Sequence, residues 1–115
     1  MDMKVSYEGI GEMAATFQAG TGVAAGQVVK MSGSGMVDGC NVGDRFCGVA
    51  LAPVDGYAAV QVGGFAKVKY TGTAPAVGFV KLSADGQGGV QVDEAGGELL
   101  VVAVDESAGT VVVRL

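Results

Sequence analysis

The second half of this chain repeats the first, and this internal repeat limits the folds that the chain can adopt. The pattern of residues 24–37 recurs at 76–90, and later residues match at a spacing of 53 positions, as Val60 and Val113 do. A unit of about 40 residues is too small to bury an apolar face by itself. We therefore expect two copies that pack on each other around a shared core, with Val49, Ala50, Val102 and Ala103 inside it.

Glycine and valine together indicate the type of secondary structure. The 115 residues are enough for one domain, and the 21 glycines separate valine-rich runs in which apolar residues alternate. Runs such as 99–104 are apolar at every position, which favours a sheet covered on both faces. The sequence predicts an all-β fold without a long helix: a small β-barrel or tight β-sandwich built from two pseudo-symmetric repeats. The expected strands are residues 12–18, 27–32, 36–38, 46–52, 57–62, 65–71, 79–83, 89–93, 99–104 and 110–115.

The repeat also divides the chain. We expect one β-domain over residues 23–115, made of repeat 1 at 23–62, a linking strand within 63–75 and repeat 2 at 76–115. Residues 1–22 lie outside the repeat, and we expect an N-terminal arm there whose edge strand pairs with the domain. Because no apolar run approaches the roughly 20 residues that span a bilayer, and no leader peptide is evident, we expect a protein made in the cytoplasm with no membrane partner.

Charge is distributed unevenly along the chain. A net charge of -5 is unfavourable for nucleic-acid binding, which needs clustered lysine and arginine. Residues 63–75 nevertheless carry Lys67 and Lys69 and no acidic residue. Strand alternation places Phe65, Lys67 and Lys69 on one face of the linking strand and Ala66, Val68 and Tyr70 on the other. This basic strand is either a solvated surface or a contact strip for an acidic partner.

Motifs typical of enzymes are missing or incomplete. The chain has no histidine, the commonest general base and metal ligand. The glycine-rich residues 20–26 are spaced one residue too widely for a dinucleotide loop, and a strand pattern follows them where a helix is needed. The adjacent acids of Asp93-Glu94 and Asp105-Glu106 would point to opposite faces of a strand, which favours a role in turns. We therefore predict a protein that is not an enzyme, with no catalytic residue, cofactor or metal ligand.

Two further residue types have alternative interpretations. Cys47 matches Leu100 of the second copy, which predicts a small buried side chain, and Cys40 matches Asp93, which predicts a turn or surface position. We expect both thiols to be reduced. Lys30-Met31 is similar to the modified lysine beside methionine in biotinyl and lipoyl carrier domains, but the expected turn lies later, at residues 33–35, so Lys30 falls inside a strand.

Four segments carry a resemblance to a known family: VAAGQVV (23–29), VGDRFCGVA (42–50), VQVGGFAKV (60–68) and VVVRL (111–115). In these segments the chain resembles the small capsid cement, or head decoration, proteins of tailed bacteriophages. The resemblance implies a β-barrel-like protein that binds the major capsid protein on the outside of the assembled head, often as a homotrimer. It implies a location on the capsid surface of the virion and no catalytic residues. The interaction residues that we expect are Met3, Lys4, Val5 and Tyr7 in the arm and Phe65, Lys67 and Lys69 on the basic strand.

Two other functions stay open from the sequence alone. One is a non-catalytic β-barrel that binds glycans or proteins, and the other is a biotinyl- or lipoyl-like carrier domain. A glycan-binding surface is expected to expose several aromatic side chains, whereas a carrier lysine needs to lie free at the tip of a hairpin.

Overall fold

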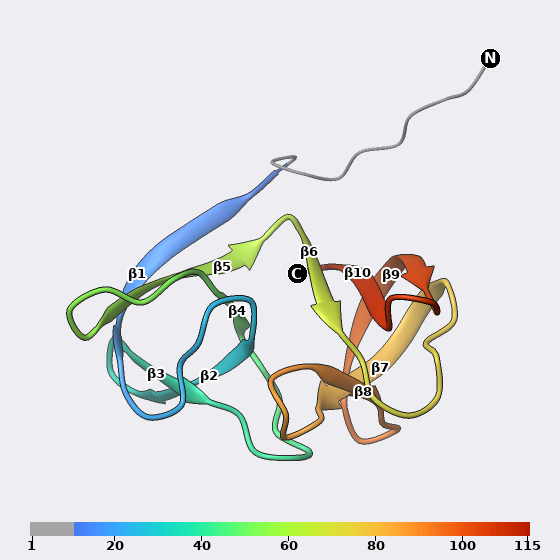
Figure 1. Cartoon of the computed structure of the whole chain (residues 1–115), viewed down its shortest axis with the longest axis horizontal. Coiled ribbons are helices and arrows are strands. Elements are labelled where there is room, and N and C mark those ends of the chain that lie inside the picture. The colour runs from blue at the N-terminus through green and yellow to red at the C-terminus, as the bar shows by residue number, and fades with distance from the viewer. Residues whose placement is uncertain (1–10) are drawn as a thin grey trace.

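The computed structural model describes residues 11–115, which form ten β-strands and no helix (Figure 1). The fold class expected from the sequence is therefore confirmed. The strands are β1 Met13–Ala19, β2 Val28–Gly33, β3 Met36–Gly39, β4 Gly48–Ala50, β5 Tyr57–Gly63, β6 Phe65–Lys69, β7 Gly78–Ala84, β8 Val90–Val92, β9 Gly97–Asp105 and β10 Thr110–Arg114.

Strands β1 to β5, the first half, form a closed barrel in the order β1-β3-β2-β4-β5. Neighbouring strands are antiparallel except β1 and β3, which run parallel and close the barrel by pairing Gln18 with Met36 and Ala19 with Val37. The strand expected at 12–18 is thus present as β1, but it is not an edge strand, because it pairs with β5 on one side and β3 on the other. Closure leaves no unpaired strand edge in this half.

Strands β6 to β10, the second half, form a five-stranded antiparallel sheet in the order β6-β10-β9-β7-β8. Its two outer strands meet where Tyr70, just after β6, forms a parallel bridge with Val90 of β8. The Thr71 amide adds a 2.9 Å hydrogen bond to the Val90 carbonyl. The first half is closed at the equivalent place, where Ala19 pairs with Val37. If β1 to β5 are matched in turn with β6 to β10, the two strand orders are the same when they are read around the closed ring in opposite directions. Both halves therefore have the same strand order and the same closing contact.

The structural repeat is therefore longer than the sequence repeat. β6 pairs antiparallel with β10 as β1 pairs with β5, which makes β1 and β6 equivalent strands. From sequence alone the first strand falls in the arm and the second in the linker, because MAATFQA and FAKVK share little beyond their apolar content. Their equivalence comes from backbone pairing, which depends on position in the sheet more than on side-chain identity.

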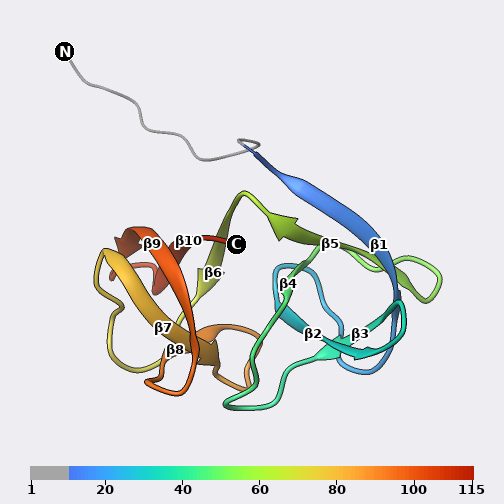
Figure 2. The ribbon, with the colours of Figure 1, turned by 180° about the vertical axis from the view of Figure 1, so that it is seen from behind.

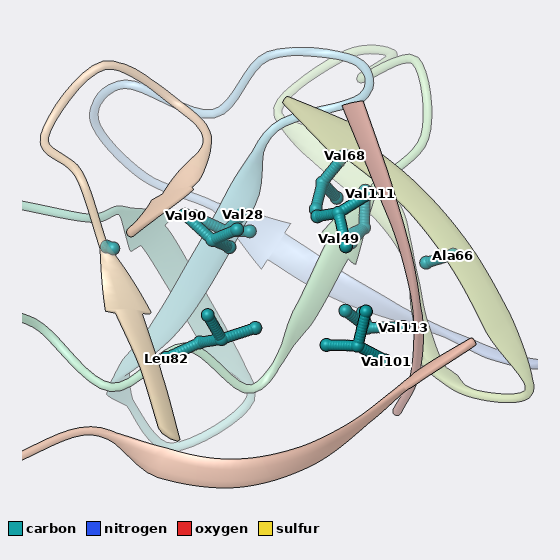
Figure 3. Close-up of a cluster of buried hydrophobic side chains, with 10 residues drawn as sticks. Val28, Val49, Ala66, Val68, Leu82, Val90, Val101, Val111 and Val113 are labelled. Carbon is teal, nitrogen blue, oxygen red and sulfur yellow. The ribbon is translucent and has the colours of Figure 1, made fainter. Parts of the chain in front are cut away.

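The core consists of two clusters of buried apolar side chains. The smaller cluster lies inside the first half and contains Val29, Val37, Ala50 and Val60. The larger cluster is shared between the halves, as the repeat predicts: Val28 and Val49 of the first half join side chains from β6 to β10 (Figure 3). The second half contributes Ala66, Val68, Leu82, Ala84, Val90, Val101, Val111 and Val113.

Of the four residues expected in the shared core, Val49 lies there, whereas Ala50 is buried in the smaller cluster of the first half. Val49 and Ala50 are buried, but Val102 and Ala103 are only half-buried, and Val101 is the residue with no exposed surface. The cause is a β-bulge: Val112 of β10 pairs with Ala103 while Val113 pairs with Val101, so Val102 is an extra residue without a partner. In the first half Ala50 pairs with Val60, so the spacing of 53 predicts that Ala103 pairs with Val113. Val101 pairs with Val113 instead, a shift of two positions of which the bulge supplies one.

Two sets of contacts join the halves. The short turn between β5 and β6 contains Gly64, and Gln61 is buried beside it, with its Nε2 donating to the carbonyls of Gly63 at 3.0 Å and Phe65 at 2.9 Å. The Leu115 amide donates to the Gly64 carbonyl at 2.8 Å. Figure 2 shows this turn as the bridge between the two halves, with the end of the chain beside β6.

The second set of contacts lies at the turn between β7 and β8. The Val28 amide donates to the Gly88 carbonyl at 3.0 Å. Nearby, Gly43 donates to Ala84 and Ala84 donates to the carbonyl of Asp44, both at 2.8 Å. This turn therefore docks directly onto the first half and forms one wall of a hollow between the two halves.

Candidate binding site

The expected basic strand is β6, and its side chains alternate as predicted. Ala66 and Val68 are buried, Lys67 and Lys69 are exposed, and Phe65 is half-buried. The two lysines lie on the same side of the strand, so their Cα atoms are roughly 7 Å apart. The other expected interaction residues, Met3, Lys4, Val5 and Tyr7, lie outside the described residues.

Both lysines line a hollow between the two halves, which we call the basic cavity. Its volume is about 350 Å³, and its walls come from the loop before β2, from β6, from the turn before β8 and from the start of β10. The lining residues are Ala25, Gly26, Gln27, Lys67, Val68, Lys69, Gln87, Gly88, Gly89 and Thr110. Sequence reasoning identified only the two lysines, because the glutamines come from loops whose docking depends on the tertiary fold.

Glycine is required where these loops meet. A Cβ atom at Gly88 would clash with the side chain of Gln27, and one at Gly89 would clash with the carbonyl oxygen of Lys69. Gly88 also has a φ of +91°, which side-chain-bearing residues rarely adopt. The glycine-rich turn thus allows a close approach that a sequence pattern records only as glycine content.

The electrostatic character of the basic cavity follows from its lining. No carboxylate is among the lining residues, and neither lysine forms an ion pair within residues 11–115. Asp85 approaches Gly89, but its carboxylate already accepts hydrogen bonds from the Thr71 hydroxyl at 2.6 Å and from the amides of Gln87 and Gly89 at 2.7 and 3.0 Å. The two ammonium groups are therefore available to an external anion in a chain whose net charge is -5.

A second cavity of about 520 Å³ adjoins the first and shares Gln27, Gln87 and Gly88 with it. Lys30, on its wall, donates to the Asp44 carboxylate at 2.6 Å, and the Asn41 amide donates to the same carboxylate at 2.8 Å. The hydrogen bond between Lys30 and Asp44 raises the pKa of Lys30 and lowers the pKa of Asp44. Lys30 lies inside β2 and is committed to a loop contact, an arrangement unlike the free hairpin-tip lysine of carrier domains.

The two cysteines are half-buried free thiols. Cys47 packs against the smaller core cluster, close to its expected place. Cys40 lies outside the strands, just after β3, and its side chain packs against the larger cluster, so it is more buried than a surface position. Burial raises the pKa of both thiols, that of Cys40 to about 11. Neither sulfur therefore has the lowered pKa of a catalytic nucleophile.

The adjacent acids Asp93-Glu94 and Asp105-Glu106 lie at turns, as their spacing predicts. Asp93 accepts from the Ala95 amide at 2.9 Å and from the Ser83 hydroxyl at 2.8 Å, and the Ala95 contact is the main cause of its lowered pKa. Asp105 accepts from the Ala108 amide at 3.1 Å. Within residues 11–115, no cluster of three cysteine or acidic side chains is placed to hold a metal ion.

Exposed aromatic side chains do not gather on one surface. Among the aromatic residues in the described range, only Tyr57 and Phe79 are more than half exposed, and they lie in different halves, on β5 and β7. The described residues therefore offer no aromatic platform of the kind that stacks on sugar rings.

Comparison with known proteins gives no relative: no family model matches the chain, and no curated protein matches it. No helix among the described residues is long and apolar enough to span a membrane.

Proposed function

We propose that this protein is a structural virion protein that binds the outside of a tailed-phage capsid and stabilises the head, without catalytic activity. Its partner is the major capsid protein, and its working form is a homotrimer on the capsid surface. Both features follow from the family resemblance of the sequence.

The observation that carries the proposal is where the four resembling segments lie. Residues 23–29 and 42–50 supply the contacts of Val28 with Gly88 and of Gly43 with Ala84. Residues 60–68 contain the end of β5, the turn and most of β6, and residues 111–115 pair with β6 and end at the Leu115–Gly64 contact. The four resembling segments therefore form the junction that fixes one half against the other. This position supports an architecture that the chain has in common with the decoration proteins it resembles.

The physical requirements of head decoration agree with this architecture. A protein that reinforces a shell needs a body that keeps its shape and presents a wide contact surface. A closed barrel and a five-stranded sheet that share a core and are joined by a short turn meet that need. Binding through many symmetric copies makes individually weak contacts sufficient. The basic cavity, whose two lysines form no ion pair among the described residues, provides one such contact on an acidic protein.

The proposal is tested by adding the purified protein to heads of the phage that encodes it, prepared from a mutant lacking this gene. We expect saturable cosedimentation with the heads, competition by unlabelled protein, and decorated heads that keep their DNA at higher temperature than bare heads. The gene itself should lie beside those for portal, protease and major capsid protein. A protein that stays in the supernatant at every concentration would contradict the proposal.

A further inference from the structure

We propose that the basic cavity binds a short extended peptide segment bearing carboxylate side chains, supplied by the capsid protein. This inference rests on the proposed function for the source of the segment. It rests on the structure for the position of the site and for the chemistry of what binds there.

The charge of the basic cavity favours a ligand with carboxylates. Lys67 and Lys69 point from one side of β6 beside a cavity with no carboxylate in its lining, and neither has an ion-pair partner among the described residues. Elsewhere in the described chain, Lys30 is paired with Asp44 at 2.6 Å. The Cα atoms of these two lysines are roughly 7 Å apart, which is also the spacing of alternate residues in an extended peptide, so each lysine can contact one of two carboxylates on such residues.

The shape and hydrogen-bonding capacity of the basic cavity favour a short peptide. A volume of about 350 Å³ is that of a small ligand site and accepts a few residues of peptide. The amides of Gln27 and Gln87 and the hydroxyl of Thr110 lie in the same lining, and they can donate to or accept from a peptide backbone. Because the Val28–Gly88 hydrogen bond and the two glycine contacts fix the walls, the site exists before its ligand arrives.

The small number of cations in the cavity favours an acidic peptide over a nucleic acid. Both are anionic, but a nucleic-acid strand carries a charge at every nucleotide and needs several cations along its path. Here the lining of the cavity contains two lysines as its cations, on a protein of net charge -5. A segment with two or three carboxylates matches the cations that are present and experiences less repulsion from the rest of the molecule.

The test is a titration followed by NMR with the peptide acetyl-Glu-Glu-Glu-amide, using acetyl-Gln-Gln-Gln-amide as the uncharged control. We expect the glutamate peptide alone to shift the backbone amides of residues 67–69 and 87–89 and the side-chain amides of Gln27 and Gln87. The double variant Lys67→Gln, Lys69→Gln should lose at least tenfold in affinity. Lys67→Arg, Lys69→Arg should retain binding, and Lys81→Gln, at an exposed lysine of β7 outside the cavity, should bind like the unmodified protein.

Several results would overturn the site. These are shifts confined to other surfaces, equal shifts with both peptides, undiminished binding by the double glutamine variant, or a preference for a single-stranded oligonucleotide over the peptide. A change of oligomeric state on mutating the two lysines, without any peptide shift, would assign the cavity to contacts between copies and overturn the inference as well. The spectrum of each variant verifies that it is folded.

Measurements of binding to phage heads distinguish this inference from the proposed function. If heads bind the unmodified protein and excess glutamate peptide releases it, both hold. If heads bind the unmodified protein and the double glutamine variant equally well, decoration holds and the cavity is not the contact. If the peptide binds the cavity but heads bind no protein, the carboxylate site holds, and both the proposed function and the capsid protein as the source of the segment fail.

Discussion

At the scale of single residues, burial differs sharply between neighbours on β9. Val101 has no exposed surface and belongs to the larger core cluster, whereas Val102 is half-buried and lies at the bulge without a cross-strand partner. A charge at the first position has no water and no counter-ion available, while a charge at the second can reach solvent.

We therefore predict opposite outcomes for two adjacent substitutions. Val101→Asp should prevent folding, because burying an unpaired carboxylate costs several kcal/mol out of a typical stability of about 5 to 15 kcal/mol. Val102→Asp should remain folded with a lowered melting temperature. Thermal unfolding followed by circular dichroism distinguishes them, and a Val102→Asp variant that fails to fold beside a folded Val101→Asp variant would show that the bulge is misplaced.

The cysteines give a second test at this scale. Because burial raises the pKa of Cys40 to about 11, its thiolate is scarce at pH 8, and reaction with a disulfide reagent should be much slower than in denaturant. The unfolded thiol loses its proton near its ordinary value of 9.0, so the free energy of unfolding should fall between about pH 9 and 11 as the folded state retains the proton. A Cys40 that reacts at pH 8 as fast as in the unfolded chain would contradict this placement.

At the scale of elements, β1 and β6 show what local sequence can and cannot predict. The alternation of buried and exposed residues in β6 follows directly from FAKVK, and the strand at β1 is also evident from sequence. Their equivalence is not, because it depends on which strands they pair with: β5 and β3 for β1, β10 and the Tyr70–Val90 bridge for β6. Pairing between distant segments leaves little trace in a single sequence.

A truncation series tests the role assigned to β1. Deleting residues 1–20 should abolish cooperative unfolding, because it removes a strand paired with β5 and β3 and removes Phe17, which packs on the smaller core cluster. Deleting residues 1–10 removes no described strand and should leave the melting transition nearly unchanged. If the longer truncation melts like the full chain, β1 is dispensable and the first half does not depend on closure.

At the scale of the whole molecule, the sequence repeat correctly predicts a shared core but not the space between the halves. The repeat places Val49 in that core, and Val28 joins it there. The basic cavity arises because the turn at Gly88 docks on the first half and brings Gln27 and Gln87 beside Lys67. The sequence pattern of either copy does not predict that Gln27, Gln87 and Lys67 lie close together, since each comes from a different loop or strand.

The most direct measurement of the central claim is a cryo-electron microscopy reconstruction of heads carrying this protein. We expect density on the outer surface of the shell with two five-stranded units in each copy, three copies around each attachment point, and Lys67 and Lys69 of β6 facing acidic residues of the capsid protein. Heads without added density would contradict the claim of decoration. Decorated heads in which β6 and the basic cavity face the solvent would contradict the mode of attachment.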